Sequence, residues 1–323
     1  MKAILFDQPG GPEVLYLGEA PQPTPSVDEL LVQVHATAVN RAEVLQRQGK
    51  YPPPPGASPI LGLELAGEVV VGAGAWRPGD RIMAVVTGGG YAEYATVPAG
   101  MALRIPEAFT YEQAAAIPEA YLTAYLNLFE LGRLQRGETV LIHAGASGVG
   151  SAAIQLAKSA GARIFTTASS AEKREFCRSI GAELAIDYRA ESFVDAILAA
   201  TDGRGVDVII DFIGAPYWSD NLKALAAGGR LLLVGFLGGA SGDLNLAPVL
   251  MKRLTVRGAT LRGMPLAEKI SLNQAFAAYA LPLFEDDLLR PVIDRVLPLN
   301  QAAEAHRLME ANANIGKIVL RVS

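Results

Sequence analysis

The hydrophobic pattern of the first third of this chain predicts a β-rich domain. Short runs rich in β-branched and aromatic residues alternate with Pro/Gly turns, at residues 2–6, 15–19, 29–38, 67–71, 81–86 and 91–97. Short strands at this spacing are typical of a compact, mostly antiparallel β domain.

A different rhythm begins near residue 138 and continues to about residue 260. Six strand-like runs are separated mostly by helical segments, at residues 140–143, 163–167, 184–186, 206–212, 230–235 and 254–259. Strand and helix alternating in this way predict an α/β fold with a doubly wound parallel sheet.

The C-terminal part returns to strand-like segments at residues 290–297 and 317–322, with a helix predicted at 300–310. We expect these segments to complete the first domain. The predicted domains are therefore 1–120 together with 281–323, and an inserted domain at 121–280.

A glycine-rich turn follows the first strand of the inserted domain. Gly145 and Gly150 fit the first and third places of the dinucleotide-binding pattern, and Ser147 stands in the second. The turn opens a helix, whose N-terminal N–H groups lack intrahelical partners and attract anions. We expect a pyrophosphate here; the alternative is a turn that merely joins a strand to a helix.

The end of the second strand of this domain bears on the choice of cofactor. An acid about 20 residues after the glycine turn usually holds the free 2′-hydroxyl of NAD. This chain has Ser169, Ser170 and then Lys173 instead. These residues favour a 2′-phosphate and hence NADPH, although Ser169 or Ser170 could also cap the next helix.

Two features of the β domain are candidates for a functional site or for the structure around it. Glu64 interrupts an apolar strand, so it is either a structural hydrogen-bond hub or part of a site. Four prolines at 52–55 follow Tyr51, and we expect them to form a rigid wall.

Composition and charge narrow the class of protein. Half of the residues are hydrophobic, yet no apolar run reaches the ~18 residues of a membrane span. The net charge is −5 and no long basic run occurs, so we expect neither a membrane nor a nucleic-acid partner. The N-terminus lacks the features of a secretory signal, and we expect a cytoplasmic protein. A single cysteine, Cys177, excludes a disulfide within the chain, and we expect it to be inert and partly buried.

Several motifs together resemble a known family. They are Asn40-Arg-Ala-Glu, Arg47-Gln-Gly-Lys-Tyr51-Pro-Pro-Pro, Ile60-Leu-Gly-Leu-Glu64, Ile117-Pro-Glu-Ala, His143-Ala-Gly-Ala-Ser-Gly-Val-Gly150 and Glu310-Ala-Asn-Ala-Asn-Ile-Gly-Lys317. The chain resembles the zinc-independent quinone oxidoreductases of the medium-chain dehydrogenase/reductase superfamily, most closely the tumour-suppressor-induced branch, with zeta-crystallin a more distant relative. The resemblance implies a GroES-like catalytic domain split around a Rossmann domain.

The chain departs from the zinc alcohol dehydrogenases of that superfamily at their metal ligands. Asn40 stands where those enzymes have a cysteine, Leu63 stands where they have a histidine, and their four-cysteine lobe has no counterpart. One cysteine and the scattered His35, His143 and His306 do not supply a catalytic zinc site. We predict no metal, and acceptors that take up a hydride readily, such as quinones or activated alkenes.

The resemblance also implies the site residues of an NADPH:quinone reductase. Those near the nicotinamide and substrate would be Asn40, Tyr51 and Thr123, and Tyr51 would stack, hydrogen-bond or donate a proton, unless it only anchors the proline run. Cofactor-binding residues would be Tyr51, Ser147, Gly148, Val149, Gly150, Ser169, Ser170, Lys173, Tyr188, Gly235, Phe236 and Leu237.

Two other functions stay open on the sequence. One is an NADPH-dependent reductase of the double bond of an enoyl thioester or alkenal. The other is a non-enzymatic, crystallin-like protein that binds NADPH or RNA, against which the acidic balance argues. We also expect a homodimer or homotetramer, formed by edge strands such as 230–235 or 254–259.

Overall fold

The computed structural model describes residues 1–322 and divides into two compact units. Of the described residues, unit 1 contains 1–122 and 262–322, and unit 2 contains 123–261. The second division thus falls earlier than the predicted residue 281. The reason is helix α9 (Leu266–Glu285), a continuous helix that contacts unit 1 along its length. Asn273 Nδ2 donates to the carbonyl oxygen of Gly100 (3.3 Å), and Phe284 packs edge-on against Tyr121 and Phe109.

Unit 1 is built on a largely antiparallel seven-stranded sheet. Its order is β14-β15-β3-β4-β5-β7, and β6 pairs with β3 beside that path. The strands are β3 (Glu29–Val39), β4 (Glu64–Val71), β5 (Arg81–Val85), β6 (Tyr94–Pro98), β7 (Ala102–Arg104), β14 (Ile293–Pro298) and β15 (Lys317–Arg321). A separate two-stranded sheet pairs β1 (Lys2–Leu5) with β2 (Tyr16–Glu19).

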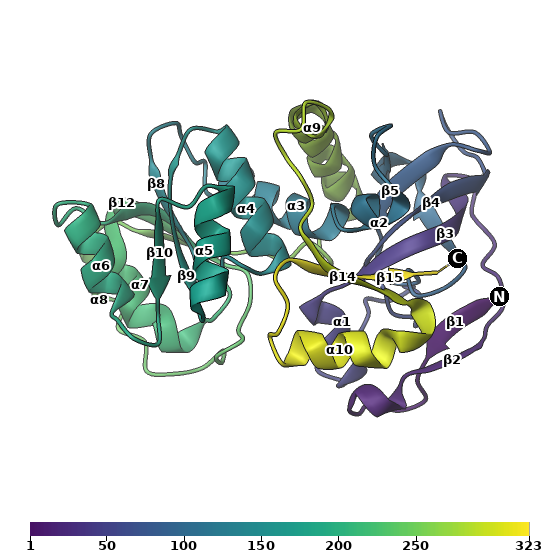
Figure 1. Cartoon of the computed structure of the whole chain (residues 1–323), viewed down its shortest axis with the longest axis horizontal. Helices are drawn as coiled ribbons and strands as arrows, with labels where there is room; N and C mark the ends of the chain where they lie inside the picture. Colours follow the sequence, from purple (N-terminus) through teal and green to yellow (C-terminus); the bar gives the residue numbers. More distant parts are fainter. Residues whose placement is uncertain (323) are drawn as a thin grey trace. The chain divides into compact units, whose positions relative to one another are not determined.

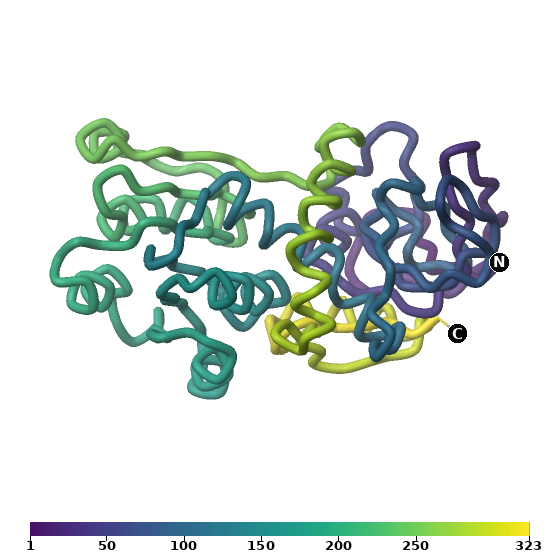
Figure 2. Tube along the Cα trace, turned by 90° about the horizontal axis from the view of Figure 1, so that it is seen from above, coloured from purple at the N-terminus to yellow at the C-terminus, as the bar shows by residue number. Residues whose placement is uncertain are grey.

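The C-terminal segment completes unit 1, as the sequence predicts. Strand β15 pairs antiparallel with β3, so that Ile318 lies opposite Val39. Helix α10 (Ala302–Glu310) covers a core that combines Ile4 and Leu61 with Ile318. Figures 1 and 2 both place the yellow C-terminal elements among the purple N-terminal ones.

Short helices connect the strands of unit 1. Helix α1 (Arg41–Arg47) follows β3, and α2 (Tyr111–Ala115) begins at a capping box of Thr110 and Gln113. Helix α3 (Pro118–Tyr125) spans the division between the units. No helix within residues 1–322 combines the length and the apolar composition needed to cross a membrane.

Unit 2 contains the predicted doubly wound parallel sheet. Its six strands lie in the order β10-β9-β8-β11-β12-β13, and every neighbouring pair is parallel. They are β8 (Thr139–Ile142), β9 (Arg163–Ala168), β10 (Leu184–Asp187), β11 (Val206–Asp211), β12 (Leu225–Leu233) and β13 (Thr255–Gly258). Each of the six predicted strands is therefore present.

Helices cover both faces of this sheet (Figure 1). One face carries α4 (Gly148–Ser159) and α5 (Ala171–Ile180), and the other α6 (Phe193–Ala200), α7 (Trp218–Ala224) and α8 (Ala247–Met251). Alternate strand residues point to opposite faces, and Leu141, Ile209 and Leu231 join the core beneath α6 and α7. Burial on both faces explains the continuous apolar runs of these strands.

The strand order reverses between β8 and β11. From β8 the chain proceeds outward through β9 to β10, and then returns to β11 on the other side of β8. In open parallel sheets, ligands bind beyond the carboxyl ends of the strands at such a reversal. The fold thus marks one edge of this sheet as a binding edge.

Candidate functional site

The carboxyl edge of the unit 2 sheet gathers the predicted cofactor residues other than Tyr51, which belongs to unit 1. Segments 147–150, 169–173 and 235–237 follow the ends of β8, β9 and β12, and Tyr188 follows the end of β10. Because the strands are parallel, all four segments meet at the same edge. The structure therefore brings together residues that are up to 90 positions apart in the chain.

Close backbone approach explains the glycines of the turn after β8. A Cβ atom on Gly145 would lie 1.9 Å from Thr166 Oγ1, and one on Gly150 would lie 2.3 Å from the carbonyl oxygen of Ala144. Both distances are too short for a side chain. The turn consequently holds the start of α4 directly against the end of the sheet.

Ser147 is the N-cap of α4. Its Oγ accepts a hydrogen bond from the backbone N–H of Gly150 (3.0 Å), and no acidic residue occupies the first turn of the helix. The N–H groups of Gly148 and Val149 lie too early in the helix to have an intrahelical acceptor. This helix end can therefore receive an anion, with the helix dipole adding to the attraction.

A buried polar chain, which our sequence interpretation did not include, braces this turn. His143 contacts Thr167 Oγ1 through Nδ1 (3.0 Å) and Asn221 Oδ1 through Nε2 (2.8 Å). Thr167 Oγ1 in turn accepts the N–H of Ala144 (3.3 Å). Burial lowers the pKa of His143 to about 4, so the imidazole is neutral at pH 7. The sequence feature that could have predicted this chain of contacts is a histidine directly after a buried strand.

The ends of β9 and β10 carry the residues predicted for the adenosine end. Ser170 caps α5, its Oγ accepting the N–H of Lys173 (3.2 Å), so the capping alternative holds for Ser170. Ser169 and Lys173 are half-buried, and Tyr188 is exposed. The nearby acid Asp187 is ion-paired with Arg174. No acid therefore takes the place at the tip of β9 where NAD enzymes hold a ribose.

The loop that contains Gly235, Phe236 and Leu237 is tied to the loop after β11. Leu237 N donates to Phe212 O (2.9 Å), and Asp211 accepts the N–H groups of Ile213 (2.7 Å) and Gly214 (3.1 Å). Burial raises the pKa of Asp211 to about 6. The side chains of Phe236 and Leu237 remain about half exposed, which leaves apolar surface at this edge.

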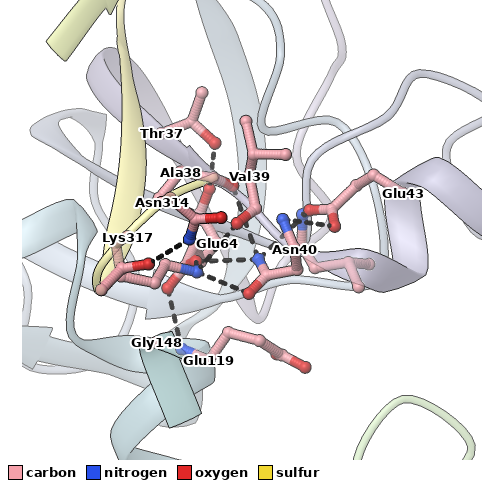
Figure 3. Close-up of polar contacts among 12 residues, drawn as sticks. Thr37, Ala38, Val39, Asn40, Glu43, Glu64, Glu119, Gly148, Asn314 and Lys317 are labelled. Atoms are coloured by element: carbon pink, nitrogen blue, oxygen red, sulfur yellow. Dashed lines mark hydrogen bonds and ion pairs between the residues drawn. The ribbon is translucent and has the colours of Figure 1, made fainter. Parts of the chain in front are cut away.

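Unit 1 contains a buried polar network around Glu64 (Figure 3). Its carboxylate accepts hydrogen bonds from Asn40 Nδ2 (2.8 Å), Lys317 Nζ (2.7 Å) and the backbone N–H of Glu119 (2.9 Å). Lys317 also donates to Asn40 Oδ1 (2.5 Å). Of the two readings of Glu64, the structure supports the hydrogen-bond hub, and the hub fixes the amide of Asn40.

Two further carboxyl groups border this network. Glu43 accepts the N–H groups of Asn40 and Leu63, each at 3.0 Å, and burial raises its pKa to about 7. Burial, reinforced by Glu64 and Glu43, raises the pKa of Glu119 to about 8. Glu119 is therefore mostly protonated at neutral pH.

The three residues predicted near the nicotinamide occupy different elements. Asn40 is the N-cap of α1 in unit 1, held in a capping box with Glu43. Tyr51 lies in the loop after α1, half-buried, with its ring over the guanidinium of Arg262. Thr123 is buried on α3, and its carbonyl oxygen accepts Asn127 Nδ2 (2.8 Å) within unit 2.

The histidines and the cysteine of the chain have other partners. His35 stacks on Tyr111 with 4.3 Å between ring centroids, and His306 contacts Arg47 and Tyr91. Cys177 is fully buried rather than partly buried as expected. Over residues 1–322, no three His, Cys, Asp or Glu side chains group as a metal-binding set.

Comparisons with known proteins match this architecture. Residues 26–107 match the alcohol dehydrogenase GroES-like domain, and residues 148–278 match the zinc-binding dehydrogenase family. The quinone oxidoreductase of Rattus norvegicus is 33% identical, covering 99% of this chain and 97% of that protein. A polyketide synthase subunit of Mycobacterium tuberculosis is 35% identical over 99% of this chain but only 15% of its own length.

A solved structure gives the same result. The Escherichia coli quinone oxidoreductase complexed with NADPH superposes with a TM-score of 0.90 at 30% identity, covering 100% of both chains. Placement in the tumour-suppressor-induced branch stays a prediction. The chain belongs to the quinone oxidoreductase family of the medium-chain dehydrogenase/reductase superfamily, with a GroES-like domain split around a Rossmann domain.

Proposed function

We propose that this chain is an NADPH:quinone oxidoreductase. The observation that carries the proposal is the carboxyl edge of the unit 2 sheet, where an open helix N-terminus after β8 lies next to hydroxyl and amine groups after β9. The quinone oxidoreductase relative and the NADPH complex of a structural neighbour support it.

The residues present fit NADPH. The amides of Gly148 and Val149, together with Ser147 and Gly150, would hold the pyrophosphate, and no acid in the first turn of α4 would repel it. Ser169, Ser170 and Lys173 would contact the 2′-phosphate and Tyr188 the adenosine end. Gly235, Phe236 and Leu237 would flank the nicotinamide ribose. The bound cofactor supplies the hydride.

The residues of the chain would mainly position the acceptor, and the one chemical step open to them is proton donation by Tyr51. Asn40 presents an amide whose orientation is fixed by Glu64 and Lys317. Its Nδ2 would exchange the longer contact with Glu43 Oε1 (3.3 Å) for a carbonyl group of the acceptor and so orient that group. We place Tyr51 and Thr123 beside the acceptor, with Tyr51 or water donating the proton that the reduced acceptor takes up. The proposal includes no metal.

A turnover assay with and without acceptor tests this function. NADPH oxidation, followed by absorbance, should require an added quinone, and ortho-quinones should be turned over faster than crotonyl-CoA. The proposal would be contradicted if quinones were reduced without NADPH, or if no quinone of the panel were reduced. Binding of NADPH or RNA without any consumption of NADPH would favour the non-enzymatic alternative.

A second candidate is reduction of the double bond of an enoyl thioester or alkenal. The match to 15% of a polyketide synthase subunit at 35% identity favours it. The same assay separates the two candidates, because this one predicts that crotonyl-CoA is turned over faster than every quinone.

We also propose a cytoplasmic homodimer or homotetramer. Strand β13 is an edge strand, whereas the segment 230–235 is not, because β12 pairs with both β11 and β13. Leu250 and Met251, which precede β13, are 82% and 78% exposed. Exposed apolar surface next to an open strand edge suits pairing with a second copy. Sedimentation should show an oligomer that Leu250→Glu weakens; a wild-type monomer would refute it, and cell fractionation tests the location.

A further inference from the structure

Arg262 is a buried cation without a carboxylate partner. Its side chain is 7% exposed, and none of the ion pairs formed within residues 1–322 includes it. Two buried acids act on it from its surroundings, and burial raises the pKa of Glu43 to about 7 and that of Glu119 to about 8. An unpaired buried charge is costly, because most buried charges in proteins have a partner of opposite charge.

Most of the guanidinium is held rigidly by unit 1. Nε donates to the carbonyl oxygen of Thr87 (3.2 Å), and Nη2 donates to the same oxygen (2.8 Å) and to Gln46 Oε1 (2.7 Å). A second buried cation, Lys269, donates to the carbonyl oxygen of Arg262 (3.3 Å). These contacts fix the plane of the guanidinium.

The remaining nitrogen, Nη1, has no hydrogen-bond partner. It is shielded from water, and the ring of Tyr51 lies over the guanidinium with its centroid 5.4 Å from Cζ. Tyr51 itself is half-buried and lies in a loop. A buried N–H donor without an acceptor costs about 1–3 kcal/mol. The unpaired Nη1 therefore lowers the stability of the fold.

We propose that Arg262 Nη1 receives a carbonyl oxygen of the acceptor and stabilises the negative charge that forms there. The inference rests on the proposed function and names its substrate class, a flat conjugated carbonyl compound whose reduced form is a phenolate. The side chain of Tyr51 rotates away from the guanidinium when the acceptor binds. The ring of the acceptor then makes the cation–π contact that Tyr51 makes in its absence.

Bound NADPH would supply the hydride and be left as NADP⁺. With the hydride delivered to one quinone oxygen, its two electrons would leave a negative charge on the conjugated second oxygen. Arg262 Nη1 would bind that oxygen until a proton from water or Tyr51 completes the hydroquinone. A fixed donor aimed at such a developing charge contributes about 10²–10³-fold to kcat.

Binding of 4-nitrophenolate, a coloured and unreactive phenolate, tests the site without turnover. We expect the wild-type protein to bind the ionised form and to lower the pKa of the bound phenol. Arg262→Gln should weaken binding at least tenfold, and Arg262→Lys severalfold, since it keeps the cation but loses the directed donor. The matched control is Arg307→Gln on α10, an exposed arginine paired with Glu304, which should change nothing.

The outcomes separate this inference from the proposed function. Loss of phenolate binding in Arg262→Gln, with unfolding temperature retained, supports the site even if no quinone is reduced, and in that case only the function fails. Binding and kcat of Arg262→Gln both within twofold of wild type would overturn the inference while leaving quinone reduction intact. If Arg262→Gln does not fold, Arg262→Lys decides by the same two readouts.

Discussion

Lys317 and Glu64 form a buried ion pair, with 2.7 Å between Nζ and Oε1, although they are 253 residues apart in the sequence. The pair joins β15 to β4 and holds the amide of Asn40 between them. Structural integrity and the orientation of a proposed site residue therefore depend on the same contact.

Removing the cation should strongly destabilise the fold. Lys317→Met leaves the Glu64 carboxylate buried without compensation, and we expect urea unfolding to show a loss of about 3–5 kcal/mol. The double variant Lys317→Met with Glu64→Gln should recover part of this loss, because the buried group is then neutral. Lys223→Met, which breaks an exposed pair with Asp220, is the control; an equal loss there would contradict the assignment.

The raised pKa of Glu119 predicts a pH-dependent stability. A carboxyl whose pKa rises from 4.5 to about 8 on folding contributes stability that is fully present below pH 4.5 and is lost as the pH rises through about 8. Glu119→Gln removes this dependence. Between pH 5 and pH 9 we expect its unfolding free energy to gain at least about 1.4 kcal/mol relative to wild type, the value of one pKa unit.

Urea unfolding at pH 5, 7 and 9 measures that gain. The exposed Glu107→Gln serves as the control and should run parallel to wild type. A constant difference between Glu119→Gln and wild type across this range would show that the buried carboxyl does not titrate as described.

Ser147 should affect both stability and cofactor binding. Loss of its cap in Ser147→Ala should cost about 1 kcal/mol. Ser192→Ala removes the analogous cap of α6, where Oγ accepts the N–H of Asp195 at 3.3 Å, and should cost a similar amount. NADPH affinity, measured by titration calorimetry, should fall only for Ser147→Ala. If Ser147→Ala bound NADPH as tightly as the wild type, Ser147 would act only as a helix cap.

Lys173 should set the preference for NADPH. Lys173→Glu places a negative charge beside the proposed 2′-phosphate, and the KM for NADPH should rise at least tenfold while that for NADH changes by less than threefold. Lys158→Glu makes the same change of charge in the last turn of α4, at the opposite edge of the sheet. Equal rises for both cofactors would remove Lys173 from the phosphate site.

Cys177 should be inert in the folded protein. It is fully buried, and burial raises the pKa of its thiol to about 12, so the reactive thiolate is scarce at pH 8. A coloured aromatic disulfide reagent should react only after unfolding in urea. Rapid reaction of one thiol under native conditions would contradict this.

The sequence by itself determined the elements whose causes are local. Apolar runs of strand length predicted all six strands of unit 2, and Gly145 and Gly150 marked the turn, because a side chain there would clash with its own neighbours. The choice of NADPH was likewise proposed from residues directly after one strand. In each case the deciding contacts lie within about 25 residues of the chain.

Only the tertiary structure decided the role of groups whose partners are distant. Glu64 was left open between a hub and a site until β15 brought Lys317 against it. Helix α9 belongs to unit 1 because Asn273 contacts Gly100 and Phe284 packs on Tyr121. Nothing in the sequence singled out Arg262. A donor that lacks an acceptor can be recognised only when the positions of all neighbouring groups are known. Burial and pairing of charges depend on which segments pack together, and no local pattern encodes that.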